Sequence, residues 1–231
     1  MIETGLDARL MSAAGFVRQG AVFADIGTDH AYLPIYLLQN GLVKRVICAD
    51  VNKGPLSLAI SNAKATGLDM SSFTFRLTDG ATGLENEGIT DYAICGMGGE
   101  LIARIIESAS HFRDTGVRLI LQPMTKQAHL RRYLYESGFR IIGEKYSFSE
   151  GKYYLTLSAE YCGEQMSVSE VEAELGMLPS EDCELAIGYY EGKARSYSVA
   201  IRGKKSAGQD SSLDELMLKS IEERINKLKE R

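Results

Sequence analysis

Short apolar runs alternate with amphipathic segments from the start of the chain to about residue 160. The runs are rich in β-branched residues and end in turn residues, which is typical of buried strands. They cover residues 21–26, 46–51, 73–77, 92–95 and 117–121. Apolar residues at i, i+3 and i+4 predict helices between the strands, over residues 6–17, 32–39, 56–65, 101–112 and 127–137. This alternation predicts right-handed βαβ units and an α/β fold with a parallel sheet covered on both faces.

The pattern changes after Gly138. Two strand-like runs, 139–148 and 153–161, flank the turn sequence Ser149-Glu150-Gly151-Lys152, which predicts an antiparallel hairpin at one edge of the sheet. Residues 167–178 follow as an acidic segment with helical periodicity, and Pro179 is expected to end that helix.

The tail has two segments with apolar residues at heptad spacing, separated by the polar stretch 203–212. The apolar positions are Tyr190, Ala194, Tyr197 and Ile201 in the first segment, and Leu218, Ile221, Ile225 and Leu228 in the second. Two short seams with a polar link predict a coiled-coil-like antiparallel helical hairpin. We therefore expect a sheet domain over residues 1–162 and a helical C-terminal domain over 163–231.

Composition adds few constraints. The chain has 231 residues, of which 45% are hydrophobic and 25% charged, as in an ordinary globular protein. No apolar run approaches the roughly 18–20 residues that span a bilayer, and Met1-Ile2-Glu3-Thr4 lacks the basic-then-apolar pattern expected of a signal peptide. The four cysteines form no C-x-x-C pair. We expect a cytoplasmic protein without a membrane segment or a metal site, and no obligate protein partner is evident.

The net charge of −5 averages two unlike parts. Residues 1–188 carry 16 Lys and Arg against 24 Asp and Glu, whereas residues 189–231 carry 10 against 7. This asymmetry is typical of a basic arm that steers a polyanion. A solvated helical hairpin explains the same charges equally well.

Three of the five predicted parallel strands end in or run into an aspartate, namely Asp25, Asp50 and Asp79. Ligands of open parallel sheets bind beyond the carboxyl ends of the strands. After the first strand only Gly27 is present of the G-x-G-x-x-G pattern that cradles a pyrophosphate, and a Walker lysine motif is absent. A cofactor anchored by its phosphates is therefore not expected.

Asp50 ends the second strand, where a carboxylate can accept both hydroxyl protons of a ribose. Ribose recognition without a phosphate-binding loop indicates S-adenosylmethionine. Asp25 would hold its ammonium, and Asp79 would accept a hydrogen bond from its adenine amino group. Gly27 and Gly96 would allow a close backbone approach. Each aspartate alone also fits a turn or helix N-cap residue. The neighbouring residues complete the predicted cofactor wall: Thr28, Val51 and Gly80.

Two strings, A-D-I-G-T-D-H-A-Y-L-P at residues 24–34 and G-M-G-G at 96–99, resemble the bacterial tRNA (adenine-N1)-methyltransferase family that modifies adenine 22. Shorter matches around residues 6–10, 54–55, 79–80, 121–124 and 150–154 extend the resemblance over about residues 4–160. The resemblance implies a Rossmann-like class I methyltransferase sheet of order 3-2-1-4-5-7-6, and a helical hairpin that holds tRNA. It also implies that Arg9 reaches the cofactor carboxylate, although a surface arginine is an equal alternative. The family often carries glutamate where this chain has Asp50.

Methylation at adenine N1 needs no strong base, because the N1 lone pair is itself nucleophilic. The enzyme must expose N1, align it with the methyl group and stabilise the cationic product ring. We expect Asp29 to provide the stabilising charge and His30 to shape the pocket, with Met97 and Gly98 as substrate contacts. A helix N-cap for Asp29, a structural role for His30 and simple packing for Met97 remain alternatives.

Basic side chains near the pocket mouth and in the tail are candidate tRNA contacts, although each alone is more often a solvated charge. They are Lys126, Arg131, Arg132, Lys193, Arg195, Arg202, Lys204 and Lys205. The leading hypothesis is thus an S-adenosylmethionine-dependent tRNA methyltransferase acting on adenine N1. A methyltransferase for a small molecule or a protein, and a non-catalytic scaffold that binds the cofactor, are the alternatives.

Overall fold

The computed structural model describes residues 5–179 and 181–231. Its seven-stranded sheet has the order β3-β2-β1-β4-β5-β7-β6, which confirms the predicted order. Strands β1 to β5 pair in parallel, whereas β7 pairs antiparallel with both β5 and β6. The strands are β1 Ala21–Ile26, β2 Val43–Asp50, β3 Phe73–Leu77, β4 Asp91–Gly98, β5 Arg118–Thr125, β6 Phe139–Ser149 and β7 Lys152–Tyr161.

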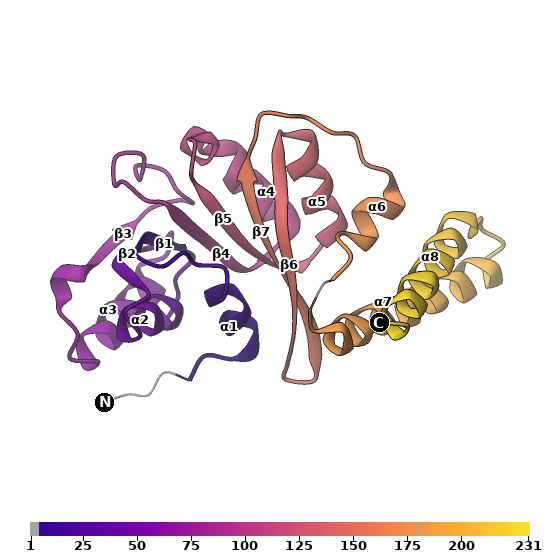
Figure 1. Ribbon diagram of the computed structural model, residues 1–231, viewed down its shortest axis with the longest axis horizontal. Coiled ribbons are helices and arrows are strands. Elements are labelled where there is room, and N and C mark those ends of the chain that lie inside the picture. The colour runs from indigo at the N-terminus through magenta and orange to yellow at the C-terminus, as the bar shows by residue number, and fades with distance from the viewer. Residues whose placement is uncertain (1–4, 180) are drawn as a thin grey trace.

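Helices cover both faces of the sheet (Figure 1). Successive residues of a strand point to opposite faces, so Phe23 packs with α1, α2 and α3 while Ala24 packs in the cluster that contains α4 and α5. The helices are α1 Ala8–Ala14, α2 Tyr32–Gln39, α3 Lys53–Ala65, α4 Gly99–Ser108, α5 Gln127–Glu136, α6 Glu170–Leu175, α7 Cys183–Ser206 and α8 Ser212–Lys229. In the described part of the chain, no helix is long and apolar enough to cross a membrane.

Two helices, α1 and α6, are much shorter in the structure than predicted. The helix expected over 6–17 begins only after Asp7, whose side chain accepts a hydrogen bond from the Leu10 amide at 2.8 Å and caps α1. The acidic helix α6 begins with a capping box at Ser169 and ends at Gly176, where φ is +60°. Periodicity alone did not place these ends, because side-chain capping and a backbone reversal decide them.

The C-terminal helices α7 and α8 pack side by side and project beyond the sheet as an arm (Figure 1), which confirms the predicted hairpin. Helix α7 runs on through Gly203 to Ser206, so the link is shorter than expected. Ion pairs between Lys204 and Asp214 (2.7 Å) and between Lys205 and Glu215 (2.9 Å) join the two helices beside the link.

The base of the arm shares a hydrophobic core with the sheet. Ala186, Tyr189 and Tyr190 of α7 are buried in the same cluster as strands β4, β5 and β7. The Tyr190 hydroxyl lies 2.9 Å from that of Tyr146 on β6. The domain boundary after residue 162 stays a prediction, and apolar packing is continuous across it.

Arg131 corrects a sequence-based expectation. Its side chain is fully buried, and its guanidinium donates to both carboxylate oxygens of Glu144 at 2.7 and 2.9 Å. It also donates to the carbonyls of Ala173 and Glu174, both at 3.0 Å, and so holds α6 against the sheet. An enclosed guanidinium with its donors occupied cannot reach a phosphate, so the prediction that Arg131 contacts RNA is wrong.

Candidate functional site

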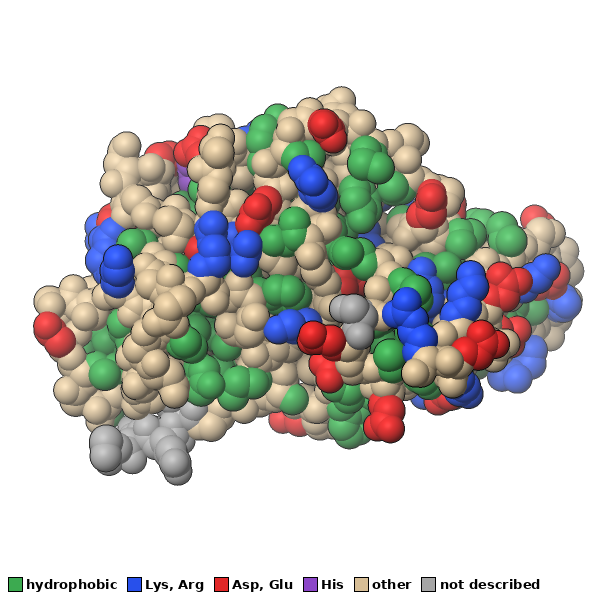
Figure 2. All heavy atoms as spheres, in the orientation of Figure 1, with side chains coloured by type: hydrophobic (Ala, Val, Ile, Leu, Met, Phe, Trp, Pro, Cys, Tyr) green, Lys and Arg blue, Asp and Glu red, His purple; other side chains and the backbone are tan. Residues whose placement is uncertain are grey.

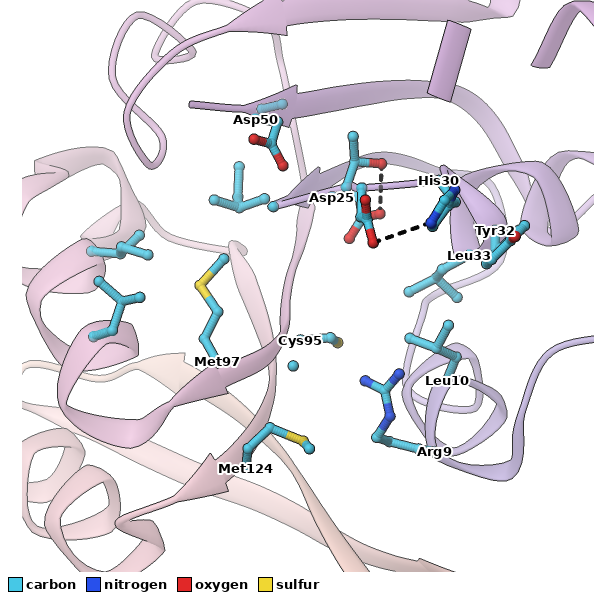
Figure 3. A pocket seen from close by; sticks show the side chains of 18 of the residues that line it. Arg9, Leu10, Asp25, His30, Tyr32, Leu33, Asp50, Cys95, Met97 and Met124 are labelled. Atoms are coloured by element: carbon cyan, nitrogen blue, oxygen red, sulfur yellow. Dashed lines mark hydrogen bonds and ion pairs between the residues drawn. The ribbon is translucent and has the colours of Figure 1, made fainter. Parts of the chain in front are cut away.

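A cavity of about 680 Å³ opens where the parallel strands end (Figure 3). Residues from α1, from the ends of β1, β2, β3, β4 and β5, and from the β6–β7 turn line it. Twelve residues singled out in the sequence meet there: Arg9, Asp25, Gly27, Thr28, Asp29, His30, Asp50, Val51, Asp79, Gly80, Gly96 and Met97. Segments far apart in the chain therefore converge on one space.

The remaining candidates do not line this cavity. Gly98 is the N-cap of α4 and does not line the cavity. Lys126 precedes α5 and lies 3.9 Å from Glu100, and Arg132 pairs with Glu170 at 2.7 Å. The tail cations lie on the arm: Lys193, Arg195, Arg202, Lys204 and Lys205.

Asp25 is the most buried acid of the cavity. One carboxylate oxygen accepts a hydrogen bond of 2.8 Å from the Thr28 hydroxyl. Burial raises the pKa of Asp25 from 3.8 to about 6, and the neighbouring Asp50 adds to this rise, whereas Thr28 and the Arg9 cation oppose it. Asp25 therefore changes its charge close to neutral pH.

Asp50 ends β2 with its side chain facing the cavity (Figure 3). Its residue is 8% exposed, and Oδ1 accepts a hydrogen bond of 2.7 Å from the Asn52 amide. No described residue donates to Oδ2, which leaves this oxygen for a ligand hydroxyl. Asp79 is exposed at the end of β3, next to Gly80, which has a φ of +57°.

The β1–α2 loop is strained around His30. Asp29 and Ala31 are non-glycine residues with φ of +44° and +57°, a conformation that costs about 1–3 kcal/mol each and often marks functional sites. Ala31 is the N-cap of α2, and no side chain caps this helix, so the N-cap interpretation of Asp29 is wrong. Instead Asp29 contacts His30 Nε2 at 3.4 Å, and the imidazole stacks on Tyr32 with ring centroids 5.1 Å apart.

Gly27 allows the close approach of two cavity walls. Its φ is +78°, and a Cβ atom built there would lie 2.3 Å from Met97 Cε. The Met97 methyl is the end of a flexible side chain and could move, so it is the left-handed backbone conformation that favours glycine at this position.

Some cavity residues were missed in the sequence. Tyr32 and Met124 are 44% and 41% exposed in its wall. Glu150 enters from the β6–β7 turn and Tyr154 from the start of β7, and both lie at this edge because β7 runs antiparallel to β5. The predicted antiparallel hairpin is the signal that could have placed this turn beside the strand ends.

The sheet order, the acidic strand ends and the lack of a phosphate-binding loop define a class I methyltransferase domain. Residues 6–157 match the family described as a methyltransferase domain. The chain is 30% identical over 242 aligned residues to the tRNA (adenine(22)-N(1))-methyltransferase of Bacillus subtilis (strain 168), covering 100% of this chain and 98% of that protein. The chain belongs to the tRNA (adenine(22)-N(1))-methyltransferase family, as the sequence strings indicated.

Solved structures agree with this assignment. A Streptococcus pneumoniae protein in complex with S-adenosyl-L-methionine has a TM-score of 0.79 at 32% identity, over 94% of this chain and 98% of that one. M. capricolum TrmK in complex with S-adenosyl-homocysteine has a TM-score of 0.72 at 25% identity, over 97% and 96%.

Proposed function

We propose that this protein transfers the methyl group of S-adenosylmethionine to N1 of adenine 22 in bacterial tRNA. The observation that carries the proposal is the convergence of Asp25, Asp50 and Asp79 on one cavity with no glycine-rich phosphate cradle. The family supports adenine 22 of tRNA as the substrate. A tRNA substrate supports a cytoplasmic location for the reaction.

The cavity fits S-adenosylmethionine, which supplies an electrophilic methyl group on a sulfonium when bound. The free oxygen of Asp50 suits a ribose hydroxyl, and the buried Asp25 carboxylate suits the ammonium. Asp79, at the exposed end of β3, would accept a hydrogen bond from the adenine amino group. Arg9 provides the one cation whose side chain lines the cavity among the described residues, and it would pair with the cofactor carboxylate. The adjoining backbone completes this wall through Gly27, Thr28, Val51, Gly80 and Gly96.

The substrate side of the cavity fits a neutral nucleophile. Adenine N1 needs no base, so the chain has to position the ring and stabilise its developing positive charge. The Asp29 side chain is 62% exposed beside the cavity, and its contact with His30 fixes its direction. We assign Asp29 to charge stabilisation, His30 to orienting the Asp29 carboxylate, and Met97 to contacting the base, whereas Gly98 lies outside the cavity lining.

Cofactor affinity is expected to rise with pH around pH 6. Only the charged form of Asp25 attracts an ammonium, and its pKa in the folded protein is about 6. Calorimetry with S-adenosylmethionine should show about tenfold tighter binding at pH 7 than at pH 5. The Asp25→Asn variant should bind more weakly at pH 7 and lose this dependence, and an unchanged dependence would assign the titration to another group.

The same titration affects stability with the opposite sign. Between pH 4 and 6 the folded protein binds a proton at Asp25 more tightly than the unfolded chain, whose pKa is near 3.8. The free energy of unfolding without cofactor should therefore fall as pH rises through this window. Asp25→Asn should be more stable than the wild type above pH 6, which separates loss of binding from loss of fold.

The arm carries the proposed tRNA-binding surface. Figure 2 shows Lys and Arg side chains interspersed with Asp and Glu along it. Lys193, Lys204 and Lys205 each pair with an acidic residue. Arg195 and Arg202 are exposed, lie seven positions apart on one helix face and make no ion pair with a described residue. These two arginines are the most available to phosphates.

Reversing both charges in an Arg195→Glu/Arg202→Glu variant should raise the KM for tRNA about tenfold and lower the salt slope of binding by about 2. Cofactor affinity should not change. A Lys44→Glu/Lys64→Glu variant makes the same change of net charge at the opposite edge of the sheet, where both lysines are exposed. Equal losses in the two variants would reveal a general charge effect and exclude a specific arm contact.

The function itself is tested by incubating a tRNA transcript with S-adenosylmethionine and the protein, then identifying the methylated nucleoside by mass spectrometry. We expect 1-methyladenosine from a transcript with adenine 22 and none when position 22 is guanine, whose N1 carries a proton. Cofactor binding without methylation of any tRNA would favour the alternative of a different substrate.

A further inference from the structure

Gln122 is a fully buried polar side chain near the end of β5. A buried amide costs free energy unless its polar atoms are hydrogen-bonded. Here Oε1 accepts two hydrogen bonds, from Arg9 Nη1 and from the Gly96 amide, both at 3.0 Å. The amide nitrogen lies 3.6 Å from Met124 Sδ. One side chain thus joins α1, β4 and β5, and all of its contact residues line the cavity.

The bond to Gly96 compensates for a break in the sheet. The β4–β5 register shifts between Cys95 and Met97, and Gly96 adopts a φ of +76° between them. The Gly96 amide is thereby bonded to the Gln122 side chain. Irregularities of this kind re-aim a side chain next to a site. In this protein Met97 is turned towards Gly27, into the cavity (Figure 3).

The bond to Arg9 fixes a cation. Arg9 is held by two groups, Gln122 on Nη1 and Asp7 Oδ2 on Nη2 at 3.2 Å. The Asp7 carboxylate is 40% exposed, so solvent weakens that ion pair. The bond to Gln122 lies deeper in the protein, and it sets the direction of a guanidinium that acts electrostatically on Asp25.

We propose that Gln122 is a positioning residue of the methyl-transfer site, which holds the Arg9 guanidinium and the irregular β4 backbone in the geometry that binds the cofactor. The proposal rests on the proposed function, because it assigns the cavity to S-adenosylmethionine. Gln122 acts through the groups that it holds and need not touch the cofactor.

The test compares two variants of the full chain. Gln122→Leu keeps the approximate volume but removes the oxygen that accepts both hydrogen bonds, and should weaken S-adenosylmethionine binding about tenfold or more by calorimetry, with a lower kcat. Gln122→Glu keeps an acceptor oxygen at this place and should retain binding within about threefold of the wild type. Wild-type affinity and kcat in Gln122→Leu, or no recovery in Gln122→Glu, would overturn the proposal.

A matched control excludes general loosening of the sheet. Leu119→Ala removes a fully buried side chain of the same strand away from the cavity and should lower Tm at least as much as Gln122→Leu. Its cofactor affinity should stay within about twofold of the wild type, because no cavity contact changes. An equal loss of cofactor affinity in Leu119→Ala would show that Gln122 only stabilises the sheet and would contradict the proposal.

A double variant isolates the part that acts through Arg9. If Gln122 positions this guanidinium, the loss of affinity in Arg9→Ala/Gln122→Leu is smaller than the product of the two single losses. A loss equal to the product would show that the two residues act independently and would contradict that part of the proposal. If the wild-type protein binds the cofactor but methylates no tRNA, the proposed function is wrong. The effect of the Gln122 variants on cofactor affinity would still hold.

Discussion

Replacing Asp50 with alanine is expected to raise the dissociation constant of S-adenosylmethionine about 100-fold, because the charge-assisted hydrogen bonds that we propose it makes to the ribose would be lost. Asp50 is almost fully buried, and water cannot easily take the place of its carboxylate. The fold should survive, because the single hydrogen bond that the Asp50 side chain makes with the described residues goes to the neighbouring Asn52 amide. Calorimetry on the ligand-free protein measures the change directly.

Asp29→Ala is the matched comparison. Its side chain is 62% exposed, and its proposed role is to stabilise charge on the substrate ring. This variant should keep cofactor affinity within about threefold and lose kcat by about 10- to 100-fold. Equal losses of cofactor affinity in the two variants would refute the division of roles between the two aspartates.

Arg131→Ala is expected to destabilise the protein by about 3–5 kcal/mol, because it leaves the Glu144 carboxylate buried without its partner. The Glu144 side chain is 1% exposed. Two backbone carbonyls of α6 also lose their donor, so α6 should detach from the sheet early in unfolding. Urea unfolding monitored by circular dichroism measures the difference.

The adjacent Arg132 provides the control. It pairs with Glu170, which is 58% exposed, and surface pairs contribute about 1 kcal/mol or less. Arg132→Ala should therefore unfold almost as the wild type does. If Arg131→Ala is stable but loses affinity for tRNA, Arg131 contacts RNA after all.

The place of the cavity could be predicted from the sequence, because the topology of a parallel sheet determines where its strands end. The apolar runs located β1, β2 and β3, and parallel strands bring their carboxyl ends to one edge. Asp25, Asp50 and Asp79 therefore had to converge once the runs were assigned. The antiparallel hairpin was equally readable, because two strand-like runs flank a short turn sequence.

Features that depend on contacts between residues far apart in the chain could not be predicted from the sequence. Arg131 sits on an amphipathic helix next to the buried Leu130, and no local pattern shows that Glu144, on β6, will enclose it. Gln122 is similar, since its partner Arg9 lies 113 positions away. The left-handed residue Asp29 was mistaken for a possible cap because sequence gives residue types and not backbone dihedral angles.

Hydrogen bonds and apolar packing hold the arm to the sheet domain, in addition to the covalent chain. Arg224 of α8 donates to the Met177 carbonyl at 2.8 Å and the Gly176 carbonyl at 3.1 Å, while Tyr190 bonds the Leu175 carbonyl. Cutting the chain before residue 189 would strip Tyr189 and Tyr190 from the common core and expose Tyr146. Chimeras that exchange arms between relatives should fold only when the docking surface on β6 and α6 is exchanged with them. Substitutions in the arm and in this docking surface are therefore expected to depend on one another.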